Sequence, residues 1–138
     1  MWPEEYFSEL GLKLNEMGFA NYIYLVCGPS KAHVAEKIIN LSNKNIFINC
    51  SNLNLLAITK VILESEMFIG NNSGPLNLSA ALNVKSYGLF ANSPISQLKY
   101  SNIKTIVPDG YKDNLFIKNR EKMKKLTVKN VLDFVSDK

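Results

Sequence analysis

Small polar residues separate an apolar strand from a helix in the segment 68–82, FIGNNSGPLNLSAAL. The first turn of a helix carries unpaired N–H groups and the positive end of the helix dipole, so it can bind a phosphate. Gly74 would let a ligand approach the backbone closely. Ser73 can cap the helix or donate its hydroxyl to a phosphate oxygen, and Pro75 stands where a missing N–H costs nothing. The same residues also make a good helix start without a ligand, so the loop alone leaves both interpretations open.

Two further polar loops follow apolar strands, at Cys27-Gly-Pro-Ser30 and at Asn49-Cys-Ser-Asn52. In open α/β sheets, ligands bind outside the carboxyl ends of the strands, which is where these loops are expected. The two cysteines, Cys27 and Cys50, have no metal-ligand spacing and no second pair. We therefore expect free thiols without a chemical role, and no metal or cofactor.

Apolar periodicity alternates along the chain between helical and strand-like patterns, separated by short polar breaks. The expected helices are 3–17, 31–41, 53–63, 75–82 and 128–135, and the expected strands are 22–26, 46–48, 67–70, 86–90 and 105–107. Strands alternating with helices of this length imply right-handed parallel crossovers. The sequence therefore predicts an α/β fold with an open, mostly parallel sheet of about five strands and helices on both faces. We expect the strands ending at Gly28 and Gly70 to be neighbours.

Composition indicates one domain spanning residues 1–138, because 46% of the residues are hydrophobic and the length is too small for two ordinary domains. No apolar run is long enough for a membrane span, and the acidic, amphipathic start MWPEEYFSEL differs from a signal peptide. We therefore expect a cytoplasmic protein with at most peripheral membrane contact. The net charge is +4, and the basic segment 118–125 (KNREKMKK) is interpreted as solvated. No nucleic-acid partner is expected.

Several motifs occur in an order that resembles the C-terminal half of family 9 glycosyltransferases, the heptosyltransferases of lipopolysaccharide core synthesis. They are Trp2-Pro3 before the first helix, Leu25-Val-Cys-Gly-Pro29 at a strand end, the segment 68–82, and Ser93-Pro94 after the fourth strand. The family pattern reads W-P, then G-G-P, then G-N-D-S-G-P-x-H-x-A-A-A-L. The resemblance covers nearly the whole chain and implies the Rossmann-like donor-binding domain of a GT-B fold.

The resemblance implies that the backbone N–H groups of Ser73, Gly74 and Leu76 hold the pyrophosphate of a nucleotide-activated sugar, ADP-heptose in the best-known members. Pro75 has no N–H to contribute. The loops at Gly28, Pro29 and Ser30 and at Ser51 to Leu53 would then lie beside the ribose and the base. The full set of expected substrate-binding residues is Gly28, Pro29, Ser30, Ser51, Leu53, Asn72, Ser73, Gly74, Pro75, Leu76 and Asn77. No catalytic residue is expected among them.

The chain departs from the family pattern at two polar positions. Asn72 replaces the aspartate of the D-S-G-P motif, and Asn77 replaces the histidine that follows. Asparagine keeps hydrogen bonding but has neither the charge of a carboxylate nor a titrating imidazole, so neither residue can act as a base or an acid. Lys31, Ala32 and His33 stand where the family often has a glutamate for the ribose hydroxyls, and His33 is predicted to be a surface residue.

The family's N-terminal acceptor domain, with the catalytic base, has no counterpart in these 138 residues, and a phosphate-contacting lysine would precede Met1. We therefore expect a donor-binding portion of a glycosyltransferase in surface glycan synthesis that is inactive alone. Its expected partners are a nucleotide-diphosphate sugar and either an N-terminal glycosyltransferase half or a second copy of this chain. Self-association would use exposed aromatics near the first helix, at Trp2, Tyr6 and Phe7. The alternative is a nonenzymatic α/β remnant or binding module with weak nucleotide affinity.

Overall fold

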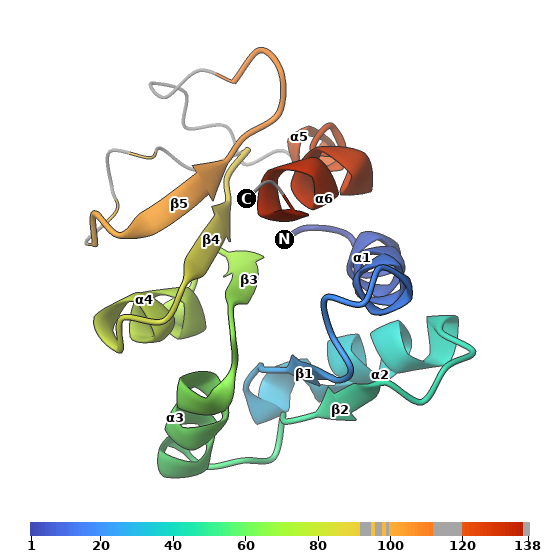
Figure 1. The fold of residues 1–138 in the computed structure, drawn as a ribbon, viewed down its shortest axis with the longest axis vertical. Helices are drawn as coiled ribbons and strands as arrows, with labels where there is room; N and C mark the ends of the chain where they lie inside the picture. Colours follow the sequence, from blue (N-terminus) through green and yellow to red (C-terminus); the bar gives the residue numbers. More distant parts are fainter. Residues whose placement is uncertain (92–94, 96–97, 99, 112–119, 137–138) are drawn as a thin grey trace. The chain divides into compact units, whose positions relative to one another are not determined.

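The computed structural model describes residues 1–91, 95, 98, 100–111 and 120–136 (Figure 1). The chain divides into two compact units, one formed by Pro3–Val61 and the other by Met1–Trp2 together with Ile62–Lys138. Each unit has its own parallel sheet and its own helices. No helix among the described residues is both long enough and apolar enough to cross a membrane.

The unit Pro3–Val61 is built around a pair of short parallel strands. Its elements are α1 (Glu4–Glu16), β1 (Ile23–Leu25), the 3-10 turn η1 (Pro29–Lys31), α2 (Ala32–Leu41) and β2 (Phe47–Asn49). β1 pairs with β2 in parallel register, with Ile23 opposite Phe47 and Leu25 opposite Asn49. The carboxyl ends of these two strands therefore lie at the same edge of the sheet.

The core of this unit joins α2 to the strands through Val34, Ile38 and Phe47. Phe7 of α1 packs against this cluster, which explains why α1 needs an apolar face. Gly11 is the point of closest approach, because a Cβ atom there would lie 2.5 Å from Cζ of Phe47 and 2.8 Å from Cδ1 of Ile23. Glycine at this helix position is therefore required by packing.

The other unit contains a three-stranded parallel sheet in the order β3-β4-β5. Its elements are β3 (Phe68–Asn71), α4 (Gly74–Ala81), β4 (Ser86–Leu89), β5 (Ile103–Ile106), α5 (Arg120–Lys124) and α6 (Val128–Ser136), while α3 (Leu55–Glu64) includes residues of both units. All four residues of β4 are buried, as expected for a central strand covered on both faces (Figure 1).

Helix α4 is held on β4 by close packing and by a buried polar contact. Leu76 and Ala80 of α4 form a core cluster with Phe90 and Ile103. Ser79 on α4 and Ser86 on β4 are both fully buried, and their hydroxyl oxygens lie 2.7 Å apart. Because a buried hydroxyl without a partner is costly, this pair fixes how α4 lies along the strand.

The predicted α/β class and every predicted helix and strand are confirmed within a few residues. The strand pairing differs from expectation. β1 pairs with β2, and β3 with β4, so the expected pairing of the strands that end near Gly28 and Gly70 does not occur among the described residues. The apolar periodicity of the sequence identifies strands. Which strands pair in a sheet depends on contacts between residues that are distant in sequence. Helix α5 was not predicted, and Ser93-Pro94 lies outside the described residues.

The prediction that Trp2 is exposed near the first helix is wrong. Trp2 is fully buried, and Tyr6 and Phe7 are half-buried. The reason for Trp2 is a contact distant in sequence, since its indole N–H reaches the backbone oxygen of Leu126. Trp2 is therefore not available for contacts with another copy of the chain, and self-association itself stays a prediction.

Replacing Gly11 with alanine should destabilise the protein. The new methyl group would overlap the buried ring of Phe47, and overpacking of this kind costs about 1–3 kcal/mol, partly offset by about 1 kcal/mol of helix propensity. Chemical denaturation should show a lower free energy of unfolding for Gly11→Ala. Gly28→Ala is the control, because a Cβ there meets no atom within 4 Å. Equal stability of Gly11→Ala and the wild type would contradict the packing.

Candidate functional site

The joint between β3 and α4 is an open helix start. Ser73 is the N-cap residue, with extended backbone angles, and α4 has no side-chain cap hydrogen bond. Instead, the Ser73 hydroxyl donates to the backbone oxygen of Asn71 at 3.1 Å. The Asn77 N–H donates to the Ser73 carbonyl at 3.2 Å. This is the first hydrogen bond of the helix. The backbone N–H groups of the residues before Asn77 therefore have no acceptor within the helix and point out of its end.

Access to these N–H groups is controlled by side chains. Gly74 is exposed, and a Cβ atom at this position would meet no atom within 4 Å. Ser73 and Pro75 are half-buried. Leu76 is fully buried in the core, so it anchors α4 while its own N–H is covered. A ligand at this helix start would meet the backbone of Ser73 and Gly74 first.

Asn71, at the end of β3, ties the joint to the beginning of the chain. Its Oδ1 atom accepts the backbone N–H of Trp2 at 2.9 Å. The Trp2 indole N–H in turn donates to the Leu126 backbone oxygen at 2.7 Å, in a fully buried position. Sequence reasoning missed this role of Asn71, although an amide directly after a buried strand is a usable signal.

The two asparagines that depart from the family pattern differ in exposure. Asn72 is exposed, and Asn77 is half-buried in the first turn of α4. Both side chains can donate and accept hydrogen bonds, and neither carries charge. The polar side chains of the joint therefore offer hydrogen bonding without acid or base chemistry.

The loop after β1 is exposed. Gly28, Pro29 and Ser30 all face solvent, and the Lys31 N–H donates to the Gly28 carbonyl at 2.9 Å to form the short turn η1. A Cβ at Gly28 would meet no atom within 4 Å. His33 is exposed, as predicted for a surface residue. This loop leaves its backbone open to a ligand, as the joint does at Gly74.

The loop after β2 is more enclosed. Ser51 is buried, its N–H donates to Oδ1 of Asn49 at 2.9 Å, and its hydroxyl oxygen has no hydrogen-bond partner among the described residues. Leu53 is 37% exposed, and its N–H donates to the Cys50 carbonyl at 3.3 Å. Because β1 and β2 are parallel neighbours, the predicted residues Gly28–Ser30 and Ser51–Leu53 follow the same edge of this sheet.

Both cysteines are free, with Cys50 buried and Cys27 half-buried. Burial raises the pKa of the Cys27 thiol. Burial also raises the pKa of Cys50, and the nearby Cys27 adds to this effect. Since the thiolate is the reactive form, both side chains stay protonated and unreactive at neutral pH. Among the described residues, no group of three or more His, Cys, Asp or Glu side chains could hold a metal ion.

The glycosyltransferase family 9 (heptosyltransferase) model matches residues 1–133. The chain belongs to glycosyltransferase family 9. It is 26% identical over 103 residues to lipooligosaccharide heptosyltransferase 2 of Campylobacter jejuni, a match that covers 70% of this chain and 30% of that protein. The chain spans 22% and 30% of the length of two curated relatives that it matches.

Two solved structures of family 9 enzymes share the fold. ADP-heptose LPS heptosyltransferase II of E. coli matches with a TM-score of 0.80 and 18% identity, over 97% of this chain and 40% of that one. E. coli heptosyltransferase WaaC with ADP-2-deoxy-2-fluoro heptose matches with a TM-score of 0.74 and 19% identity, over 97% of this chain and 38% of that one. The expected relation to GT-B heptosyltransferases is confirmed.

Replacing Trp2 with phenylalanine should weaken folding of the unit that carries the joint. The variant keeps an aromatic ring but leaves the Leu126 carbonyl without its buried donor and removes side-chain volume, which together cost about 2–4 kcal/mol. Thermal and chemical denaturation would measure the loss. Tyr22→Phe is the control, because Tyr22 is 63% exposed and should change stability by less than about 0.5 kcal/mol. Unchanged stability of Trp2→Phe would contradict the anchoring role.

Proposed function

We propose that this chain is the donor-binding portion of a family 9 glycosyltransferase and that it binds the pyrophosphate of a nucleotide sugar at the start of α4. The observation that supports this most is the open backbone at Gly74, where an added Cβ would meet no atom within 4 Å and no side chain caps the helix by a hydrogen bond. A related protein, WaaC, was solved with an ADP-heptose analogue. An ADP-heptose-like donor is the corresponding ligand for this chain.

The proposed interaction uses backbone groups and the helix dipole. The N–H groups of Ser73 and Gly74 can donate to phosphate oxygens, and the Ser73 hydroxyl can rotate from the Asn71 carbonyl to do the same. The dipole adds about 0.3–1 kcal/mol for each charge at an exposed site and up to about 2 kcal/mol when the site is partly enclosed. With these contributions alone, the expected affinity for a nucleoside diphosphate is in about the high micromolar range.

The joint is proposed to bind and not to catalyse. Asn72 and Asn77 can hold sugar hydroxyls or phosphate oxygens, but they cannot accept the proton of an acceptor hydroxyl. Transfer also requires that hydroxyl to be aligned on the anomeric carbon in a water-poor cleft. We therefore assign donor binding to these residues, and glycosyl transfer in surface glycan synthesis to the chain only together with an acceptor-binding half.

For the unit Pro3–Val61 taken by itself, we propose that its two strand-end loops, Gly28–Ser30 and Ser51–Leu53, contact the ribose and base of a nucleotide. Gly28, Pro29 and Ser30 offer an exposed backbone, while Ser51 offers a buried hydroxyl that has no partner among the described residues. Leu53 supplies a partly exposed apolar surface suited to a base. None of these groups distinguishes adenine from another base.

A second candidate function is a nonenzymatic binding module. The side chains of Asn72 and Asn77 favour this function, because they are neutral and stand where the family pattern has an aspartate and a histidine. Such a module would still bind nucleotides at the start of α4. Transfer activity after the chain is combined with a family 9 N-terminal half would distinguish the two candidates.

Replacing Gly74 with valine should abolish nucleotide binding without unfolding the protein. The branched side chain would occupy the space that a phosphate needs, while the absence of any atom within 4 Å of the added Cβ predicts little effect on folding. Calorimetric titration with ADP should show weak binding to the wild type and none to Gly74→Val. Ala81→Val, at the exposed far end of the same helix, is the matched control and should bind ADP like the wild type.

Two results would overturn the proposal. One is equal ADP affinity of Gly74→Val and the wild type, with both proteins folded by circular dichroism. The other is loss of binding in Ala81→Val to the same extent as in Gly74→Val, which would show that any change in α4 is sufficient.

A further inference from the structure

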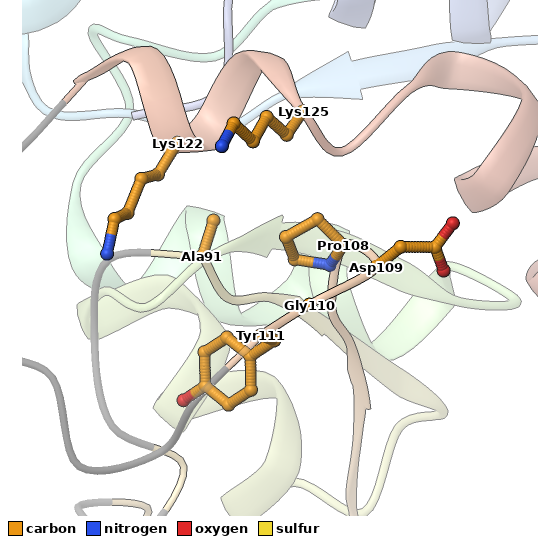
Figure 2. A pocket seen from close by; sticks show the side chains of 7 residues that line it. All are labelled: Ala91, Pro108, Asp109, Gly110, Tyr111, Lys122 and Lys125. Atoms are coloured by element: carbon orange, nitrogen blue, oxygen red, sulfur yellow. The ribbon is translucent and has the colours of Figure 1, made fainter.

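A small cavity of about 60 Å³ lies beyond the carboxyl ends of β4 and β5 (Figure 2). It is lined by Ala91 after β4, by the turn Pro108-Asp109-Gly110-Tyr111 after β5, and by Lys122 and Lys125. A single water needs about 10–15 Å³ of such space, so the cavity can hold a group of several heavy atoms. It belongs wholly to the unit that carries the joint of β3 and α4.

The floor of this cavity is a defined turn. The Tyr111 N–H donates to the Pro108 carbonyl at 3.2 Å. Gly110 has a φ of +78°, the value that the third residue of a type II turn requires. The Tyr111 hydroxyl accepts the Ile95 N–H at 3.0 Å, which fixes the ring as one wall. Hydrogen bonds therefore hold both the turn and the Tyr111 ring that line this cavity.

The backbone that carries Lys122 and Lys125 is held by buried neighbours in sequence. Met123 and Leu126 are almost fully buried, and the Leu126 carbonyl accepts the Trp2 indole N–H. Lys122 lies in α5 and Lys125 directly follows it, and the Lys125 N–H donates to the Lys122 carbonyl at 3.2 Å, which holds the two residues in one turn of backbone. Figure 2 shows the side chain of Lys122, in α5, and that of Lys125, directly after α5, on the side of this segment that faces Ala91 and Pro108.

Among the described residues, no side chain of the cavity lining forms an ion pair with Lys122 or Lys125. Neither lysine forms a salt bridge with any residue that the structure describes. Asp109 is the one acid in the lining, and Figure 2 shows its carboxylate directed away from both ammonium groups. Two positive groups therefore face a space at the strand-end edge of the sheet, where α/β proteins bind ligands.

We propose that this cavity is a second anion site, in which Lys122 and Lys125 bind a phosphate group by charge-assisted hydrogen bonds. It goes beyond the proposed pyrophosphate site, because it uses ammonium groups after β4 and β5 instead of the backbone after β3. The segment 118–125, interpreted from sequence as merely solvated, thus supplies two ligand-binding side chains. The phosphate belongs either to the nucleotide or to a phosphorylated saccharide.

The test is a titration of the full chain with sodium phosphate, at ionic strength held constant with sodium chloride, followed by amide resonances in nuclear magnetic resonance spectra. We expect saturable changes in the amide chemical shifts of Gly110 and Lys125. The double variant Lys122→Gln/Lys125→Gln should bind phosphate at least about fivefold more weakly. Lys13→Gln/Lys60→Gln removes the same charge from exposed positions in the other unit and should keep wild-type affinity.

Two competitors identify the source of the phosphate. Displacement of inorganic phosphate by ADP would assign the cavity to the nucleotide, and displacement by glucose 6-phosphate would assign it to a saccharide. Gly74→Val should retain the phosphate response at Gly110, so failure of the pyrophosphate site is distinguishable from failure of this one. The proposal would be overturned if the wild type and Lys122→Gln/Lys125→Gln bound phosphate equally. It would also be overturned if the chemical-shift changes at Gly110 were no larger than with sodium chloride alone. In either case, the remaining role of the lysines would be to stabilise the end of α5.

Discussion

The buried hydrogen bond from the Trp2 indole N–H to the Leu126 carbonyl holds together the unit that carries both proposed ligand sites. Through its backbone N–H, the same residue binds Asn71, directly before the start of α4. Leu126 follows the segment that presents Lys122 and Lys125. One residue near the beginning of the chain therefore contacts both the end of β3 and the segment that follows α5. This gives a physical reason for tryptophan at the Trp-Pro motif.

Recognition at the start of α4 is proposed to depend on backbone and shape more than on charged side chains. Gly74 leaves the helix end open, while buried Leu76 and the Ser79–Ser86 contact keep α4 fixed on β4. Under this proposal, binding by backbone N–H groups does not depend on the side chains of Asn72 and Asn77, which stand where the family pattern has Asp and His. This difference removes acid and base chemistry. Donor binding can therefore persist in a chain whose side chains at this joint do not catalyse.

Sequence reasoning predicted the helices and strands well because each long element carries a regular apolar period. It also placed the three polar loops at strand ends, since strands followed by Gly, Pro or Ser have a recognisable boundary. It missed α5, which has five residues and is mostly charged. It also misjudged Trp2, because the partner of its indole N–H lies 124 residues away. Pairing into two sheets also depends on neighbours that are separate in sequence, which no local pattern contains.

The most direct test of the central claim is a map of amide chemical-shift changes on adding ADP to the isotope-labelled chain. The account predicts that the largest changes occur at Ser73 and Gly74, because their N–H groups would donate to the pyrophosphate. Changes confined to other residues, with Ser73 and Gly74 unaffected at saturating ADP, would show that the segment between β3 and α4 is a helix start without a ligand.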